Sequence, residues 1–519
     1  MNGAQALIRT LVNAGVNVCF ANPGTSEMHF VAALDAVPEM RGVLTLFEGV
    51  ATGAADGFSR IAERPAAVLL HLGPGLGNGL ANLHNARRAG TAVLTVVGDH
   101  ATYHKRFDAP LESDIDALAG AVSGWVQRTE RIQDVARDAA AAVAAAIGPP
   151  AEVVTLILPA DVSWQLGASV APAPTPPTPG PPLVRDEALS AAAAALGSGE
   201  PAVLLIGGDA TRERGLCAAA RISAATGAKL LCETFPTRLE RGAGLPMVGR
   251  LGYLPEMATY QLGGAKHLVL AGARSPVTFF AYPGQPGDLV PATCRVHELM
   301  GPAGASAALE RLAELLAMDI KAPLAELCRP RLPTGELTAQ SAAEVIGALL
   351  PEAAIVVDES NTSGVFLNPA TEGAPRHDWL ALTGGAIGYG LPAATGAAIA
   401  APERPVLCLQ ADGSAMYTIS ALWTHARENL NITTVIFNNR AYAILRLELR
   451  KVGVDGAMGP KAEALLDLSE PTIDFVALAT GMGVPAARAT TAEQLAEALR
   501  TALAEPGPHL IDAIVPPVV

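Results

Sequence analysis

Aromatic residues, cysteines and long apolar runs are scarce in this 519-residue chain. Only 4% of its residues are aromatic, and its six cysteines lie apart in apolar segments, which favours neither disulfides nor a zinc site. No apolar run approaches the about 20 residues of a membrane-spanning helix, and we expect no secretory signal. Because 36 Lys and Arg stand against 50 Asp and Glu, the net charge is −14, which opposes binding to nucleic acids or anionic membranes. The sequence therefore predicts a cytoplasmic protein whose partners are small molecules.

Proline-rich stretches divide the chain into three segments, and each has a length that fits one domain. The clearer divider is the run APAPTPPTPGPP, whose prolines favour an extended chain. A shorter one, RPRLPTG, precedes a helical pattern at 338–350 in which Ser341 and Glu344 have capping-box spacing. We predict a first domain at 1–170, a linker at 171–182, a central domain at 183–328, a linker at 329–337 and a third domain at 338–519.

In each segment, short apolar runs alternate with alanine-rich stretches of helical length. This alternation is typical of parallel sheets covered by helices on both faces. The fold class that it predicts is α/β, with three doubly wound parallel sheets. The predicted strands are 16–20, 43–47, 66–70, 92–97 and 153–158 in the first domain, 202–206, 229–232 and 267–271 in the central domain, and 354–357, 406–410, 433–437 and 509–515 in the third domain.

Polar turns follow the third-domain strands at 406–410 and 433–437. Because the carboxyl ends of parallel strands share one edge of a sheet, we expect the two turns to lie together. The carboxylate of Asp412, the amide oxygen of Asn439 and the carbonyl of Ala441 are hard oxygen ligands suited to Mg²⁺ or Ca²⁺. A metal held by one carboxylate normally completes its shell with phosphate oxygens, so the pattern indicates a phosphate-bearing ligand.

The same turns resemble a known family. Asp-Gly-Ser, followed 27 residues after the aspartate (439 − 412 = 27) by the second Asn of an Asn-Asn pair, is similar to the motif that binds thiamine diphosphate (ThDP). One departure is Ala411, where the family usually has Gly. Further runs resemble benzoylformate decarboxylase and its acetolactate synthase-like relatives: FANPGTSE at 20–27, the segment 47–60, LLHLGPGLGNG at 69–79, TGGAIGYGLPAA at 383–394 and SAMYTISAL at 414–422.

This resemblance extends over the whole chain and implies ThDP and Mg²⁺ as cofactors, with Ca²⁺ able to replace Mg²⁺. It assigns Glu48 to the aminopyrimidine ring of ThDP, although a Glu at a helix start is also favoured by the helix dipole alone. It assigns Ile387 to the apolar wedge that bends the cofactor, and the carbonyl of Gly385 to the 4′-amino group. The residues that it places around the diphosphate and the metal are Asn361, Thr362, Asp412, Gly413, Ser414, Asn439, Ala441 and Tyr442.

The resemblance also points to residues for proton transfer and substrate binding. His71 aligns with an active-site His of benzoylformate decarboxylase, and Thr25 stands where that enzyme has a substrate-binding Ser. A histidine at the end of a strand can donate or accept a proton near neutral pH. The second catalytic His of that enzyme is missing here, since the corresponding loop reads FFAYPG at 279–284. His100 and His104 are candidates to replace it, although histidines in surface loops are often structural.

The resemblance implies a non-oxidative decarboxylase that releases CO₂ and an aldehyde from a 2-oxo acid by way of an enamine. A carboligase of the acetolactate synthase type, which joins two 2-oxo acid units, is the close alternative. A catalytically silent binding or regulatory relative is an alternative of another class. Glu448 stands where benzoylformate decarboxylase has an aromatic pocket residue, so the sequence does not assign benzoylformate as the substrate.

Flavin and assembly are further points that the resemblance raises. Acetolactate synthases usually hold FAD in the central domain, but Gly207-Gly208-Asp209 lacks the third glycine of a dinucleotide-binding turn, so the sequence does not support FAD. In the family, active sites lie between two subunits and dimers commonly pair. We therefore expect a homotetramer built from dimers, with active sites at the subunit interface.

Overall fold

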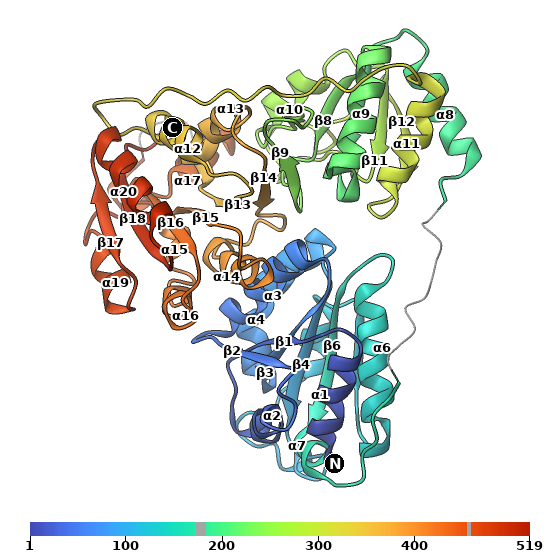
Figure 1. Cartoon of the computed structure of the whole chain (residues 1–519), viewed down its shortest axis with the longest axis vertical. Helices are drawn as coiled ribbons and strands as arrows, with labels where there is room; N and C mark the ends of the chain where they lie inside the picture. Colours follow the sequence, from blue (N-terminus) through green and yellow to red (C-terminus); the bar gives the residue numbers. More distant parts are fainter. Residues whose placement is uncertain (173–182, 454–457, 519) are drawn as a thin grey trace.

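A computed structural model of the chain describes residues 1–172, 183–453 and 458–518. Residues 173–182 of the predicted proline-rich linker therefore lie outside the described residues. The described chain folds around three sheets, which occupy separate regions in Figure 1. This arrangement confirms the predicted α/β class with mainly parallel sheets. The domain boundaries themselves stay predictions.

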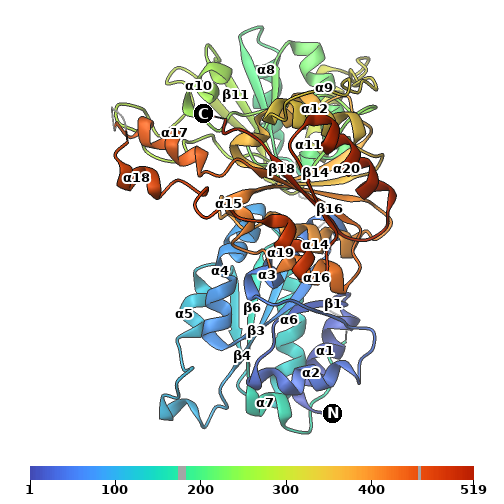
Figure 2. The ribbon, with the colours of Figure 1, turned by 90° about the vertical axis from the view of Figure 1, so that its left-hand side faces the viewer.

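The first sheet has six parallel strands in the order β2-β1-β3-β4-β6-β5, and helices cover both of its faces (Figure 2). Its strands are β1 (Val18–Ala21), β2 (Arg41–Leu44), β3 (Ala66–His71), β4 (Val93–Asp99), β5 (Trp125–Arg128) and β6 (Val153–Pro159). Its helices are α1 (Gly3–Asn13), α2 (Met28–Leu34), α3 (Glu48–Ala62), α4 (Leu72–Ala89), α5 (Ile115–Gly120), α6 (Val135–Ile147) and α7 (Ala160–Trp164).

The second sheet has five parallel strands in the order β10-β8-β7-β11-β12. Its strands are β7 (Ala202–Ile206), β8 (Lys229–Cys232), β10 (Gly249–Arg250), β11 (His267–Ala271) and β12 (Arg295–Met300). The helices around it are α8 (Asp186–Leu196), α9 (Glu213–Thr226), α10 (Pro255–Leu262) and α11 (Ala305–Leu316).

The third sheet has seven strands in the order β17-β18-β16-β15-β13-β14-β9. Its strands are β13 (Ile355–Glu359), β14 (His377–Ala381), β15 (Val406–Ala411), β16 (Ile432–Asn438), β17 (Ala486–Ala489), β18 (His509–Ile514) and β9 (Leu239–Arg241). Its helices are α12 (Ala339–Leu349), α13 (Leu367–Ala370), α14 (Gly390–Ala400), α15 (Asp412–Ala415), α16 (Ala421–Arg427), α17 (Ala443–Lys451), α18 (Pro460–Ala464), α19 (Phe475–Gly481) and α20 (Ala492–Ala504).

Strand β9 belongs to the third sheet although its residues lie in the central segment of the sequence. It pairs antiparallel with β14, with His377 opposite Arg241 and Trp379 opposite Leu239. Three residues without a strong apolar pattern give no signal for this pairing, so the sequence did not predict it. The central and third domains are therefore joined by backbone hydrogen bonds as well as by side chains.

Helices α3 and α14 bring the first and third domains together, between the two sheets in Figure 1. The two helices carry the same sequence, Ala-Thr-Gly-Ala-Ala, at 51–55 and 394–398. Small side chains let their backbones approach closely, and a methyl group added to Gly396 would collide with the carbonyl of Ala54. One apolar cluster accordingly runs through both domains.

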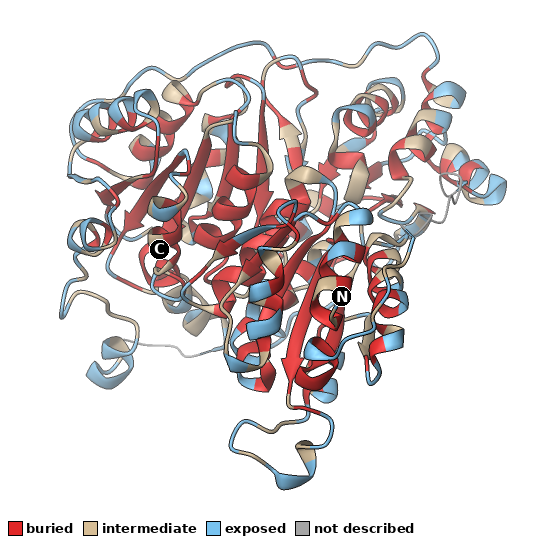
Figure 3. Ribbon diagram, turned by 60° about the horizontal axis from the view of Figure 1, so that its bottom comes forward, coloured by how far each residue is buried: buried red, intermediate tan, exposed pale blue. Residues whose placement is uncertain are grey.

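The core consists of buried strands and of the inward faces of the helices (Figure 3). A second apolar cluster joins the central and third domains. In the part of the chain that the structure describes, no helix combines the length and the apolar composition that crossing a membrane would require.

Most predicted strands are present within one to three residues, but the sequence missed six strands, of which all except β14 lie at a sheet edge. These are β5, β9, β10, β12, β14 and β17, which are short, partly polar, or both. The capping box of α12 is also one turn earlier than predicted: Thr338 caps the helix and pairs with Ser341, whereas Glu344 contacts Gln340. Thr338 precedes the helix with extended backbone, which is the geometry that an N-cap requires.

The close packing of α3 on α14 predicts that Gly396→Ala destabilises the protein. The added methyl group has no space, so we expect the free energy of unfolding to fall by about 1–3 kcal/mol. Urea unfolding followed by fluorescence measures the change. Gly481→Ala is the matched control, because a methyl group at Gly481 in α19 meets open space; an equal loss in both variants would contradict the packing argument.

His425 predicts an acid-sensitive step in stability. Burial lowers the pKa of this His from 6.5 to about 4, against the opposing hydrogen bond from its ring to the carbonyl of Leu391. The unfolded chain takes up a proton near pH 6.5 and the folded chain does not, so stability falls as the pH drops from 6.5 towards 4. We expect His425 to contribute about 2 kcal/mol of the stability lost between pH 7 and pH 5. Urea midpoints of His425→Gln at both pH values should show a correspondingly smaller difference.

Candidate functional site

The two predicted polar turns lie side by side at the carboxyl ends of β15 and β16. The carboxylate of Asp412 accepts hydrogen bonds from the backbone N–H of Gly413 at 2.7 Å and of Arg440 at 2.6 Å. The side-chain oxygen of Asn439 accepts the N–H of Ala441 at 2.9 Å. The parallel pairing of β15 with β16 is the reason that residues far apart in sequence meet here.

The oxygen atoms of this pair of turns suit a divalent cation. Burial raises the pKa of Asp412 to about 6, and no basic side chain among the described residues forms an ion pair with it. A buried carboxylate without a counter-ion is costly, and a bound cation would remove that cost. The carbonyl of Ala441 accepts no backbone hydrogen bond in the described chain, so it is free to act as a ligand. The donor set therefore fits Mg²⁺ or Ca²⁺.

The residues predicted to face a diphosphate surround this pair of turns. Ala411 has φ −80°, so its methyl group is accommodated without strain. Ser414 lies in α15, which has four residues and begins at Asp412. The amide of Asn361 donates to the hydroxyl of Ser414 at 2.9 Å, and Thr362 follows it in the 3₁₀ turn η5 (Asn361–Phe366). The ring of Tyr442 packs against Gly413.

The turn at 384–388, between β14 and α14, is held by side chains of α4 from the first domain. The ring of His84 contacts the carbonyl of Gly384 at 3.2 Å, and the amide of Asn85 donates to the carbonyl of Ala386 at 2.8 Å. The carbonyl of Gly388 accepts from Asn82 at 3.1 Å. These three peptide oxygens are satisfied within the protein.

The carbonyl of Gly385 differs from its neighbours. It accepts no hydrogen bond from any described residue, and Gly385 itself is exposed with φ +73°. Ile387, two residues later, is half-buried and packs against the cluster shared by the first and third domains. The turn therefore presents one free carbonyl and one apolar side chain, which are the two groups that the family resemblance requires for ThDP.

Glu48 is the first residue of α3 and is 8% exposed. The amide of Asn78 donates to its carboxylate at 3.1 Å. Asn82 links this helix start to the turn, because its amide also donates to the carbonyl of Gly49 at 2.8 Å, beside its bond to Gly388. Thr418, four residues after Ser414, donates to the same Gly388 carbonyl at 3.1 Å. A continuous series of contacts within one chain thus runs from the helix of Glu48 to the turn of Asp412.

His71 ends β3 and its ring is oriented by a carboxylate that the sequence analysis missed. Its Nδ1 lies 2.8 Å from the carboxylate of Glu27, which is 2% exposed, and 3.2 Å from the hydroxyl of Ser26. Glu27 also accepts the N–H of Gly24 at 2.8 Å. Thr25 is exposed at the start of this segment. Glu27 belongs to the run FANPGTSE, so its presence in that run was the one available signal.

The candidates for the missing second His lie near the end of β4, the strand next to His71. The rings of His100 and His104 are 5.4 Å apart, and Nε2 of His100 is buried without a described hydrogen-bond partner. In the central domain, the loop that lacks a His places Phe279 against Tyr253, with ring centroids 4.9 Å apart. The structure gives none of these groups a contact with His71 or Glu48 among the hydrogen bonds of the described residues.

Glu448 in α17 points towards the central domain. Its carboxylate accepts the hydroxyl of Tyr282 at 2.8 Å and that of Tyr253 at 3.3 Å. Burial, together with this carboxylate, raises the pKa of Tyr253 to about 12, so the hydroxyl stays protonated and can donate. Lys451, one turn further along α17, donates to Glu256 at 2.6 Å. Side chains therefore hold α17, the helix after the predicted metal turn, against the central domain.

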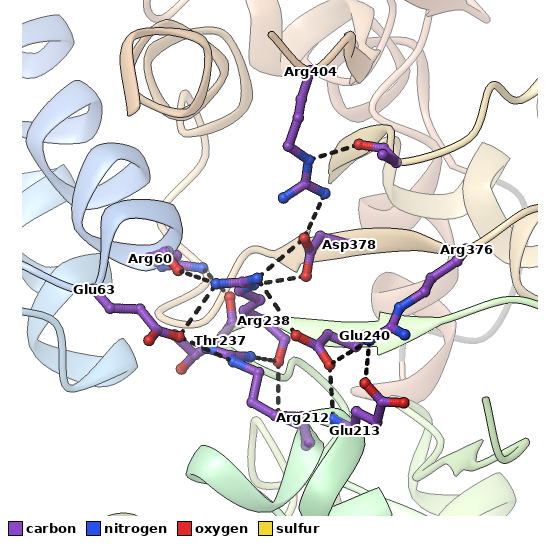
Figure 4. A network of polar contacts seen from close by, with 12 residues as sticks. Arg60, Glu63, Arg212, Glu213, Thr237, Arg238, Glu240, Arg376, Asp378 and Arg404 are labelled. Atoms are coloured by element: carbon purple, nitrogen blue, oxygen red, sulfur yellow. Dashed lines mark hydrogen bonds and ion pairs between the residues drawn. The ribbon is translucent and has the colours of Figure 1, made fainter. Parts of the chain in front are cut away.

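A polar network joins the three domains close to this site (Figure 4). Arg60, at the other end of α3 from Glu48, forms a fully buried ion pair with Asp56 at 2.7 Å. It also donates to the carbonyl of Ala381 at 2.7 Å, at the end of β14. Arg238 of the central domain binds Asp378 of β14 at 2.6 Å and donates to the carbonyl of Arg60 at 3.4 Å. No sequence motif marks these residues, because they come from three separate segments.

Two family models match the chain. The thiamine pyrophosphate enzyme N-terminal TPP binding domain matches residues 1–119, and the thiamine pyrophosphate enzyme C-terminal TPP binding domain matches residues 367–513. The first range contains Glu27, Glu48 and His71, and the second contains the turns of Gly385 and Asp412.

Named relatives and solved structures agree with these matches. The chain is 68% identical over the full length of both proteins to "Putative acetolactate synthase large subunit IlvX" of Mycobacterium tuberculosis. It is 31% identical to the benzoylformate decarboxylase of Pseudomonas aeruginosa, over 96% of each protein. The structure of a thiamine diphosphate-dependent 4-hydroxybenzoylformate decarboxylase from Rhodococcus jostii RHA1 is similar with a TM-score of 0.85 and 25% identity, over 99% of each chain.

The contacts of Glu448 predict that Tyr282→Phe loosens α17. The variant removes the shorter of two hydrogen bonds to a carboxylate, so we expect amide hydrogen exchange within 443–451 to become several-fold faster. Exchange followed by mass spectrometry on peptides measures the effect. Tyr260→Phe is the control, since Tyr260 is 86% exposed; equal exchange in both variants would show that the Tyr282 bond does not restrain the helix.

Proposed function

The chain belongs to the thiamine pyrophosphate enzyme family, and from this premise we propose that it is a ThDP- and Mg²⁺-dependent non-oxidative decarboxylase of a 2-oxo acid. The proposed products are CO₂ and an aldehyde. The observation that carries the proposal is the buried carboxylate of Asp412, which has no basic partner among the described residues and lies beside the side-chain oxygen of Asn439 and the free carbonyl of Ala441. When bound, ThDP would supply the carbon that attacks the keto group and the ring that accepts its electrons.

We assign the cofactor contacts to the residues that the turns bring together. The diphosphate would be received by the polar groups beside α15, and Mg²⁺ by one carboxylate, one amide oxygen and one carbonyl. Ile387 would support the bend of the cofactor. The diphosphate residues are Asn361, Thr362, Gly413, Ser414 and Tyr442, and the metal ligands are Asp412, Asn439 and Ala441.

Glu48 is proposed to exchange a proton with the aminopyrimidine nitrogen. Glu48 lies at a helix start, where it is shielded from solvent, and the amide of Asn78 donates to its carboxylate. These contacts restrict the carboxylate to one direction. The free carbonyl of Gly385 would accept the 4′-amino group; in the dimer proposed below, the Glu48 and the Gly385 that meet one cofactor would come from two subunits. Together these two groups would select the tautomer of the pyrimidine that the chemistry needs.

His71 is proposed to move a proton at the substrate end of the site. Its Nδ1 is paired with the buried carboxylate of Glu27, so Nε2 is the nitrogen left to face a reactant. Glu27 would fix the tautomer and the orientation of the ring. Thr25, exposed beside this pair, would offer a hydroxyl to the substrate carboxylate.

A carboligase of the acetolactate synthase type is the second candidate, and the name of the Mycobacterium tuberculosis relative favours it. FAD is not part of either proposal. The carboxylate of Glu233 lies against Gly207, at the turn after β7 where a dinucleotide phosphate would approach, and an acid in that place opposes a phosphate. A catalytically silent relative is the third candidate; the buried Glu48 with its directed carboxylate argues against it.

We further propose a cytoplasmic homotetramer built from dimers that share active sites. The segment after β4 exposes Tyr103 and Phe107, each 61% exposed, together with Leu111 at 41%. Apolar side chains gathered on one projecting segment are typical of a surface that a second subunit covers. All six cysteines are free, as is common for proteins of a reducing compartment.

The proposed function predicts that the purified protein binds ThDP in the presence of Mg²⁺ and releases CO₂ from at least one member of a panel of 2-oxo acids. Calorimetry measures binding, and chromatography identifies the product: an aldehyde supports decarboxylation, whereas an acyloin supports the carboligase. In Glu48→Gln we expect cofactor binding within about threefold of wild type and turnover lowered at least about 100-fold, since the proton relay is removed.

The control variant is Glu344→Gln, which changes an acid on the exposed side of α12. It should keep both binding and turnover. Full turnover in Glu48→Gln would refute the assignment of Glu48, and wild-type protein that binds ThDP but converts no 2-oxo acid would favour the silent relative.

A further inference from the structure

Glu359 is a buried carboxylate at the end of β13 that has no part in the function proposed above. It is 2% exposed. One carboxylate oxygen accepts the N–H of Gly388 at 2.7 Å, and the other accepts the N–H of Gly390 at 2.6 Å. The amide of Gln410, in the neighbouring strand β15, donates to the second oxygen at 2.8 Å.

This carboxylate is held by neutral donors alone. No ion pair joins Glu359 to a basic side chain among the described residues, and burial raises its pKa above the ordinary value. Keeping a charge in such a place is costly unless several hydrogen bonds are directed at it. An apolar residue would avoid that cost but would leave the two backbone N–H groups buried without acceptors. The carboxylate of Glu359 is therefore the acceptor that these two buried N–H groups require.

Those peptide groups flank the turn that presents Gly385 and Ile387. The N–H that Glu359 binds at Gly388 belongs to the peptide bond formed by the carbonyl carbon of Ile387. On the opposite side, α4 binds the carbonyls of Gly384, Ala386 and Gly388. The turn is thus fixed from the first domain through its carbonyls and from β13 through its N–H groups.

Close approach on the β13 side depends on the residue at the start of α14. A side chain at Gly390 would collide with the side-chain oxygen of Gln410 and would press against the carboxylate of Glu359. Glycine at this place lets the helix begin directly against the carboxylate. The anion also lies at the N-terminus of α14, where the helix dipole favours negative charge.

We propose that Glu359 is a positioning residue for the cofactor: by fixing the peptide after Ile387, it sets the direction of the apolar wedge and of the Gly385 carbonyl. This inference rests on the proposed function. Glu359 itself touches neither cofactor nor substrate and acts only through the turn. The contact joins a carboxylate, both oxygens of which accept, to two backbone N–H groups. A neutral side chain of the same shape therefore cannot reproduce it.

Glu359→Gln tests the proposal, because an amide retains the shape but can accept through one atom only. An amide NH₂ must then face the N–H of Gly388 or that of Gly390, and the turn relaxes. We expect the Kd for ThDP with Mg²⁺ to rise at least about tenfold. We also expect the rate at which the thiazolium C2 proton of bound ThDP exchanges with D₂O, read by acid quench and NMR at saturating cofactor, to fall at least about tenfold.

The matched control is Asp209→Asn in the central domain. Asp209 likewise accepts two backbone N–H groups, those of Gly304 and Ser306, each at 3.0 Å. Its loss should lower stability without changing cofactor affinity or C2 exchange. If Glu359 acted on stability alone, Glu359→Gln would likewise keep wild-type cofactor affinity and C2 exchange, and that result would overturn the proposal.

Two further variants keep the test decisive. Glu359→Asp retains the charge but is too short to reach both N–H groups, so it should show an intermediate loss, and it serves if Glu359→Gln does not fold. Ile387→Ala combined with Glu359→Asp should lose less binding free energy for ThDP than the sum of the single changes, because both act on one turn; strict additivity would contradict the proposal.

Wild-type protein that fails to bind ThDP would overturn the proposed function and this inference together, whereas normal binding with unaffected Glu359 variants would overturn the inference alone.

Discussion

The placement of α3 depends on the buried ion pair between Arg60 and Asp56. The guanidinium reaches out of the first domain to the carbonyl of Ala381 in the third and that of Thr237 in the central domain, so one side chain contacts all three. A buried ion pair stabilises only when its remaining donors are satisfied, and here they are satisfied by the neighbouring domains. Because Glu48 is the first residue of the same helix, the contacts of Arg60 set the direction in which Glu48 points.

The candidate site is built from turns, which lack the hydrogen-bond ladders of the strands that precede them. Side chains from other elements supply the missing order: Asn82 and Asn85 bind carbonyls, while Glu359 and Asp412 bind N–H groups. Because side chains bind only some of the peptide groups in these turns, other backbone atoms accept no hydrogen bond from the described residues. The carbonyls of Gly385 and Ala441 are the clearest cases. A turn fixed in this way can present a free polar atom without being flexible.

Much of this architecture could be predicted from the sequence, because its signals are local. Apolar runs predicted the buried strands, and the polar residues after β15 predicted the role of Asp412 and its neighbours. Glu27, Glu359 and Arg60 could not be found in the same way. Glu27 and Glu359 have their partners on other elements, and Arg60, although it pairs with Asp56 of its own helix, also donates to carbonyls of two other domains. The strands β14 and β9 were missed for a related reason: their pairing is decided by tertiary contacts rather than by their own composition.

The pairing of β9 with β14 has a consequence for biosynthesis. The ribosome completes the central domain, including residues 239–241, well before it synthesises residues 377–381. During that interval β9 has no partner in its final sheet, and the nascent chain carries an open edge that other unfolded chains can join. Chaperone protection over this stretch of translation would therefore matter more for this chain than for one whose sheets close in sequence order.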